Sequence, residues 1–162
     1  MKRKQTGFTL IELSLFMGLF TVIIGVLMSL FASIVQKQLE VQSVSAVEAD
    51  SKFILSRLSY DIQRSDAIVV PSSLGDTTSS LVLSIDGDTY AYDLTGGIMQ
   101  LTTSIGPAAL NSVRSTVSDV SFKRLGNTAG THAVELTYKV TSKITRTQGP
   151  ETKIIKTVIG TR

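Results

Sequence analysis

Among the residues of this chain that could do chemistry, the most unusual by its position is a glutamate. Glu12 lies five residues after Gly7 and directly before residues 13–35, a stretch of 23 residues with no charged side chain. An ionisable group beside so long an apolar run is costly in lipid, and a group retained there usually has a functional partner. Glu12 is therefore the first candidate for a site residue.

The other reactive side chains fit catalysis poorly. The single histidine, His132, follows a Gly-rich turn at the start of an expected strand, where a solvent-exposed edge position explains it. The serines include no G-x-S-x-G sequence, and there is no Walker A loop or dinucleotide fingerprint. Without cysteine, neither a disulfide nor a thiolate metal site can form. We therefore expect a non-enzymatic protein that needs no cofactor.

Two aspartates form a weak candidate for a metal site. Asp86 and Asp88 flank Gly87, and alternating carboxylates are suitable ligands for a hard cation such as Ca²⁺. Only Asp93 adds another carboxylate close by in the sequence. A type I′ turn between two strands explains the same residues, because Asp-Gly is a strong hairpin signal. The sequence therefore favours the turn over a calcium site.

The distribution of charge bears on nucleic-acid binding. The net charge of +3 comes from Lys2, Arg3 and Lys4, because the other 13 basic residues balance 13 acidic ones. Strand alternation would place Lys139 and Lys143 on one face, where they could bind the phosphates of DNA. A solvated sheet face has the same pattern, and aromatic stacking partners are scarce there. The basic residues of this C-terminal part are Arg114, Lys123, Arg124, Lys139, Lys143, Arg146, Lys153 and Lys156.

The N-terminal elements are predicted to form one long helix. Residues 13–35 would extend about 35 Å as a helix, enough to cross the hydrocarbon core of a membrane. No small-residue break of a cleaved signal follows, and no Pro or Gly occurs in residues 26–65, so we expect a helix over about residues 9–65. In its second half, an amphipathic stripe is predicted from Val44, Val47, Ile54, Leu58 and Ile62.

Beyond this helix, short β-prone runs alternate with turn residues. The expected strands cover residues 68–70, 81–85, 89–94, 98–103, 117–125, 133–144 and 153–159, with a polar loop at 72–80 and another loop at 105–114. Strands at this spacing predict an antiparallel sheet packed against the second half of the helix, which is an α+β fold.

The N-terminus resembles the motif of type IV prepilins. A short basic leader precedes the sequence GFTLIE at residues 7–12, and a long apolar helix follows. In that family, prepilin peptidase cuts after the glycine and N-methylates the new terminus. The resemblance implies cleavage between Gly7 and Phe8 and methylation of Phe8. It also implies that Glu12 sets the subunit register by pairing with the terminal amine of a neighbouring subunit.

The resemblance also implies a division of the chain. Residues 1–7 would be the leader, 8–35 the transmembrane and filament-core helix, 36–66 the amphipathic helix and 67–162 the antiparallel β head. Major pilins usually carry a proline where this chain has Ser29, and this difference favours a minor pilin. The order of the later elements is similar to minor pilins of the W type and minor pseudopilins of the J type.

The function implied by the resemblance is a structural subunit that helps to assemble or initiate a filament. Type IV pili, type II secretion pseudopili and competence filaments share the motif. The implied partners are prepilin peptidase, other pilin or pseudopilin subunits, the inner-membrane assembly platform and, before assembly, membrane lipid. The chain would cross the inner membrane once, with its N-terminus in the cytoplasm, and then join a filament in the periplasm or at the cell surface. The alternative is a signal-anchored protein whose β domain binds a ligand or DNA, such as a DNA-uptake subunit of a competence pilus.

Overall fold

The computed structural model describes residues 9–127 and 130–161. One helix, α1 (Leu10–Gln63), contains 54 residues and confirms the helix expected over about residues 9–65. The chain divides into two compact units, with the boundary between Gln38 and Leu39, so α1 contributes residues to both. Because neither Pro nor Gly occurs in residues 26–65, nothing in the sequence breaks the helix near that boundary.

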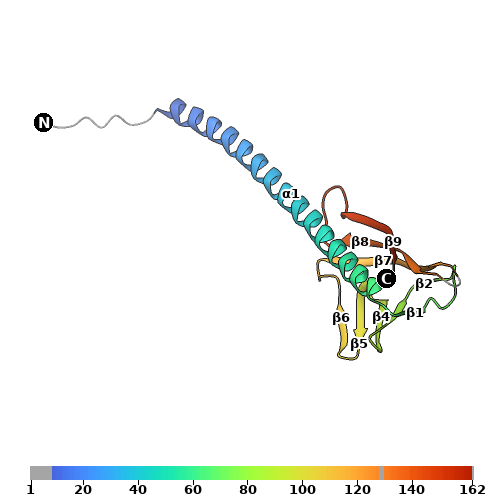
Figure 1. Ribbon diagram of the computed structural model, residues 1–162. Coiled ribbons are helices and arrows are strands. Elements are labelled where there is room, and N and C mark those ends of the chain that lie inside the picture. Colours follow the sequence, from blue (N-terminus) through green and yellow to red (C-terminus); the bar gives the residue numbers. More distant parts are fainter. Residues whose placement is uncertain (1–8, 128–129, 162) are drawn as a thin grey trace. The chain divides into compact units, whose positions relative to one another are not determined.

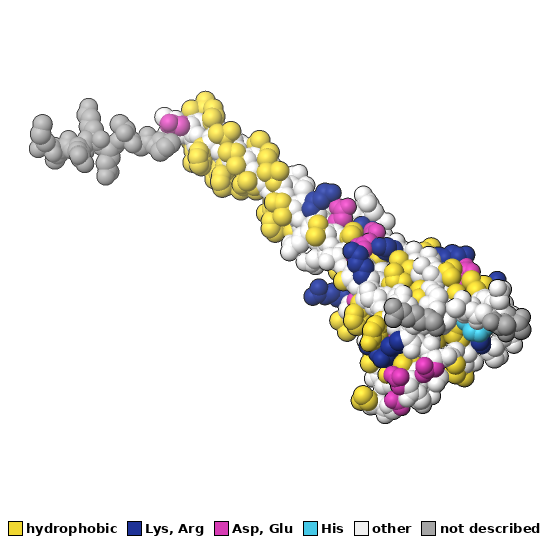
Figure 2. Space-filling view, viewed as in Figure 1, with side chains coloured by type: hydrophobic (Ala, Val, Ile, Leu, Met, Phe, Trp, Pro, Cys, Tyr) yellow, Lys and Arg dark blue, Asp and Glu magenta, His cyan; other side chains and the backbone are white. Residues whose placement is uncertain are grey.

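In the first unit, residues 13–35 of α1 carry no charged side chain, and apolar residues lie all round the helix. Every residue from 10 to 39 is exposed, and Figure 2 shows hydrophobic side chains covering this part of the helix. A helix with apolar residues around its whole circumference must be covered by lipid or by other protein. By length and composition, α1 is long and apolar enough to cross a membrane.

The second unit combines the rest of α1 with two antiparallel sheets (Figure 1). The first sheet has the strand order β1-β3-β4-β5-β6, and the second has the order β2-β7-β8-β9. The strands are β1 (Ala67–Val70), β2 (Thr77–Thr78), β3 (Leu81–Ile85), β4 (Asp88–Thr95), β5 (Ile98–Thr103), β6 (Gly106–Ala109), β7 (Ser115–Gly126), β8 (His132–Ser142) and β9 (Thr152–Gly160). The predicted α+β class, with a helix packed on antiparallel strands, is confirmed.

The strands form two sheets, and the loop expected at residues 105–114 contains a strand of the first. β6 pairs with β5 and forms one edge of that sheet. Between the two sheets, the Val117 N–H of β7 donates to the Gly97 carbonyl in the β4–β5 turn at 2.9 Å. The polar loop expected at 72–80 likewise contains β2, which pairs with β7.

The core contains most of the predicted helix stripe. Val47, Ile54, Leu58 and Ile62 are buried, as predicted, but Val44 is 38% exposed, so that part of the prediction is wrong. The preceding Ser43 is buried instead, because it lies one helical turn before Val47 on the same face. The strands add further buried side chains, among them Leu81, Leu83, Tyr92, Phe122, Leu136 and Tyr138.

Candidate functional site

Glu12 lies in the first turn of α1, and its side chain is exposed. Its backbone N–H donates to Thr9 Oγ1 at 3.4 Å, and the Thr9 hydroxyl donates to Glu12 Oε2 at 3.5 Å. The other predicted residues of this site, Gly7 and Phe8, lie outside the described residues. The proposed cleavage and methylation positions therefore stay predictions from the sequence.

The contacts between Thr9 and Glu12 form a helix cap that the sequence reasoning missed. Thr9 precedes the first helical residue, and its hydroxyl accepts an N–H group that has no partner within the helix. The spacing Thr-x-x-Glu before an apolar run is the signature of a capping box, so the signal was present in the sequence. A carboxylate at a helix N-terminus is also favoured by the helix dipole. Glu12 thus has a local role within its own chain.

The candidate metal ligands lie in the turn between β3 and β4. Asp86 and Gly87 both have positive φ angles, 52° and 85°, as a type I′ turn requires. The Asp86 N–H donates to Asp66 Oδ2 at 2.7 Å, so a carboxylate contributes to holding the turn. Asp88 is the first residue of β4 and is exposed. Within residues 9–127 and 130–161, no three acidic or histidine side chains come together as metal ligands would.

His132 is not the exposed edge residue that the sequence suggested. It begins β8, which pairs with β7 on one side and β9 on the other, and its side chain is half-buried. Its Nδ1 atom is buried and has no hydrogen-bond partner among the described residues. No serine, cysteine or carboxylate is bonded to it, so the described part of the chain brings no nucleophile to this base.

Half of the basic residues considered for DNA binding contact carboxylates. Lys139 Nζ lies 3.9 Å from Asp119 Oδ2, and Lys156 Nζ lies 2.7 Å from Glu135 Oε1. Lys153 and Arg146 pair similarly, with Glu48 and Glu151 respectively. Arg124 instead donates to the backbone carbonyls of Ile68, Pro71 and Ser72. These contacts reduce the positive field that a phosphate-binding stripe would need.

A buried carboxylate near the end of α1 is bonded to two arginines and a tyrosine. The side chain of Asp61 is fully buried; its Oδ2 accepts from Arg57 Nε at 2.9 Å, and its Oδ1 accepts from Arg64 Nε at 3.0 Å. The Tyr92 hydroxyl of β4 also donates to Asp61 Oδ2. Burial and, after it, this hydrogen bond raise the pKa of Tyr92. Asp61 therefore fixes the end of the helix to β4.

Further contacts fix the middle of α1 to other strands. Asp50 Oδ2 accepts from the Ser112 N–H at 3.1 Å, from the Ser112 hydroxyl at 2.8 Å and from the Ser115 hydroxyl at 2.6 Å. The Tyr138 hydroxyl of β8 donates to the Ser51 carbonyl at 2.9 Å. These bonds hold the loop before β7, and β8 itself, against one face of the helix.

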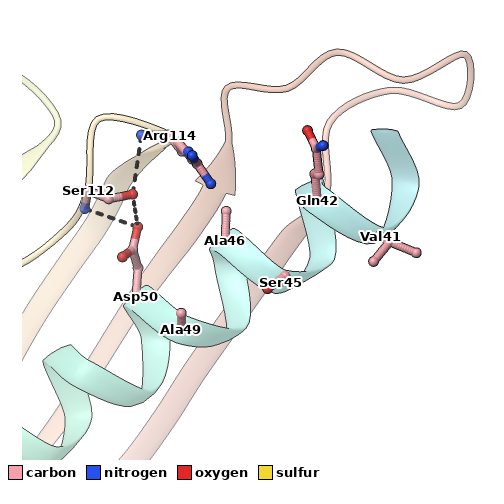
Figure 3. Close-up of a pocket in the computed structure, with 8 residues that line it drawn as sticks. All are labelled: Val41, Gln42, Ser45, Ala46, Ala49, Asp50, Ser112 and Arg114. Atoms are coloured by element: carbon pink, nitrogen blue, oxygen red, sulfur yellow. Dashed lines mark hydrogen bonds between the residues drawn. The ribbon is translucent and has the colours of Figure 1, made fainter. Parts of the chain in front are cut away.

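An open groove of about 390 Å³ lies beside Asp50. Figure 3 shows Asp50 directed at Ser112, while Ala46 and Ala49 present only methyl groups along the helix. Asp50 Oδ2 accepts three hydrogen bonds from Ser112 and Ser115, so beside the groove this carboxylate holds the start of β7 to α1.

The comparisons with known proteins give no match. No family model, no curated protein and no solved structure matches this chain. The argument for a function therefore depends on the sequence motif and on the geometry described above.

Proposed function

We propose that this protein is a minor pilin or pseudopilin, a structural subunit that is processed by prepilin peptidase and polymerises through the first half of α1. The proposal covers the pilus, pseudopilus and competence filaments that share the GFTLIE motif at residues 7–12. Its function there would be to help assemble or initiate the filament.

One observation carries the proposal. The first part of a single helix of 54 residues is exposed and carries no charged side chain over residues 13–35, whereas one face of its later part is buried against a folded β head. A soluble domain gains nothing from about 35 Å of unpacked apolar helix, at 1.5 Å per residue. A filament subunit needs this division, because its apolar half is covered first by lipid and afterwards by the helices of its neighbours.

The charge distribution indicates in which direction the chain would cross the membrane. Lys2, Arg3 and Lys4 precede the apolar half of the helix, and basic residues are retained on the cytoplasmic side of membranes. The head would then lie outside the cytoplasm. The cleavage site would lie at the cytoplasmic surface of the inner membrane, where prepilin peptidase and the assembly platform would meet the chain.

Mass spectrometry of the N-terminus of the native protein tests the proposal. We expect the mature chain to begin at N-methylated Phe8 in cells with prepilin peptidase, and at Met1 in cells without it. Gly7→Leu should block cleavage, because a bulky side chain prevents close approach of the backbone to the peptidase. Gly18→Leu is the matched control; a Cβ at Gly18 meets no atom within 4 Å, so cleavage should continue. An intact N-terminus in assembled filaments would contradict the proposal.

A further inference from the structure

The strand β9 forms one edge of the second sheet, and its pairing with β8 is regular along its whole length. The register runs from Ala133 opposite Gly160 to Thr141 opposite Thr152 without a bulge. At 9 residues, β9 is longer than the other strands that end a sheet, β1, β2 and β6. A long and regular edge presents a row of backbone donors and acceptors to any extended chain.

The ladder shows which backbone groups of β9 point away from β8. The Glu151 carbonyl accepts from Ser142, and the Thr161 N–H donates to His132, so both groups point toward β8. Bonding alternates along an antiparallel strand with a period of two residues. The N–H and C=O groups of Ile154, Lys156 and Val158 are therefore directed at the open edge. No backbone hydrogen bond of the described residues connects them to another segment.

The side chains of these three residues make the edge apolar. Ile154 is 66% exposed and Val158 is 55% exposed. Lys156 lies between them, but its ammonium group contacts Glu135 of β8, and this contact lowers the pKa of the Glu135 carboxyl. A lysine at an edge usually discourages pairing. Here, its ammonium group is drawn toward β8, while the side chain stays 68% exposed and can still attract a carboxylate.

The other sheet edges are protected in the ways that proteins commonly use. β1 has an irregular register between Ile68 and Val70, and Pro71 follows it. β6 contains Pro107, and β2 has only 2 residues. Among the described strands that end a sheet, β9 alone has no proline, no bulge and no shortening. By this contrast, the β9 edge is the described sheet edge best suited to pair with another strand.

We propose that β9 binds an extended segment of a different protein, which adds to the sheet as a further antiparallel strand. Main-chain hydrogen bonds would supply affinity, and the side chains on the outer face would supply specificity. The segment should carry apolar β-branched residues opposite Ile154 and Val158, with a carboxylate between them opposite Lys156. Cross-strand pairs of these types stabilise antiparallel sheets.

A second copy of this chain is a poor occupant of the edge. In the full-length antiparallel register, Lys156 of one copy would face Lys156 of the other. Like charges directly opposite each other destabilise an antiparallel pair, so this register is unfavourable. In a parallel two-fold pair, the exposed faces of the two β9 strands would lie on opposite sides of the joined sheet.

Amide hydrogen exchange on the full chain in lipid nanodiscs tests the proposal. The probe is a peptide of 9 residues, the length of β9, with the sequence Thr-Glu-Ile-Thr-Glu-Thr-Val-Thr-Gly. It places a glutamate opposite Lys156 and apolar residues opposite Ile154 and Val158. We expect saturating peptide to slow exchange at these three amides by about tenfold or more, while the intervening amides, already bonded to β8, change little. Replacing the central glutamate of the peptide with lysine should weaken binding by about tenfold.

Two variants separate edge pairing from other modes of binding. Ile154→Pro removes an N–H that points to the open edge, where proline is tolerated, so the sheet should fold but lose the peptide. Ile154→Thr keeps the N–H and should retain most of the binding. Unchanged exchange with the wild-type chain, or equal binding by Ile154→Pro, would overturn the proposal.

A separate test distinguishes a different protein from a second copy at the β9 edge. Because the natural chain has no cysteine, disulfides can form only between introduced cysteines. Self-pairing would place Ile154 of one copy opposite Val158 of the other. The double variant Ile154→Cys, Val158→Cys should stay monomeric in nanodiscs under mild oxidation. Efficient disulfide-linked dimers would identify a second copy as the occupant and overturn the proposal. None of these measurements depends on leader cleavage, so they can fail while the proposed function stands, and the reverse is also true.

Discussion

Glu12 has two roles to separate, and the geometry at the start of α1 makes their separation possible. Within its own chain, Glu12 takes part in a helix cap with Thr9, through contacts of 3.4 and 3.5 Å. In the proposed filament, it would neutralise the buried amine of Phe8 in a neighbouring subunit. Both contacts are long for hydrogen bonds, so the cap should stabilise the helix by only about 0.5 kcal/mol, the lower limit for such caps. Loss of the partner of a buried charge costs about 3–5 kcal/mol.

Three substitutions give different results under the two roles. Glu12→Gln keeps the capping-box geometry, because glutamine serves at this position, but it removes the charge. Thr9→Ala removes the cap and keeps the charge. Glu12→Ala removes the charge and the contact with the Thr9 hydroxyl, but keeps the backbone N–H that donates to Thr9 Oγ1. If pairing dominates, Glu12→Gln and Glu12→Ala should both lose incorporation into filaments by a factor of 100 or more, about 3 kcal/mol, whereas Thr9→Ala should assemble nearly normally.

The assay compares each variant in sheared filaments with the same variant in the membrane fraction. Leader cleavage and membrane insertion should be preserved in all three variants, because the two Glu12 substitutions remove a charge and make insertion easier, and Thr9→Ala leaves the charge unchanged. Normal incorporation of Glu12→Gln together with failure of Thr9→Ala would refute the pairing role and assign Glu12 to the helix cap alone.

Two further predictions concern the head. Asp61→Ala leaves the buried Tyr92 hydroxyl without its acceptor, while Arg57 and Arg64, 35% and 32% exposed, can turn to water. We expect Asp61→Ala to lower the free energy of unfolding by about 2–4 kcal/mol and Tyr92→Phe to lower it by about 1 kcal/mol. Denaturant titration of the full chain in detergent measures both values. Stability should also fall in alkali. Burial raises the pKa values of Tyr92 and Tyr138 above the unfolded value of about 10, and in Tyr92 the hydrogen bond to Asp61 raises it further. The unfolded chain then loses protons first, so stability is complete below about pH 10 and decreases above it by about 1.4 kcal/mol per pH unit for each tyrosine; Tyr92→Phe should halve this slope.

The elements that follow from local sequence rules were predictable. The helix could be predicted because residues 26–65 contain no breaker, and the β3–β4 hairpin because Asp86-Gly87 accepts positive φ angles at little cost. β6 could not be predicted, because its sequence Gly-Pro-Ala-Ala is typical of a loop. Its edge position tolerates Pro107. The division into two sheets depends on which strands pair over long distances in the sequence, so local rules do not predict it either.

The important polar residues of α1 were harder to predict. Asp50 and Asp61 look like solvent-facing charges in an amphipathic helix. What identifies them is their partners, Ser112 and Tyr92, which lie 62 and 31 residues away in the sequence. Only the spacing of Asp61 relative to Arg57 and Arg64, four residues before and three after, was a local signal. Long-range partners of this kind depend on the tertiary fold.

The positions of these contacts along α1 have a mechanical consequence for the head. Glu48 bonds to β9, Asp50 to the loop before β7, Ser51 to β8 and Asp61 to β4. Because the contacts are distributed over about four helical turns and reach both sheets, no rotation or sliding of this part of the helix can preserve them all. The β9 strand is therefore presented in a fixed direction relative to residues 39–63. A partner bound at its edge would be held by this same set of contacts, rather than by a flexible linker.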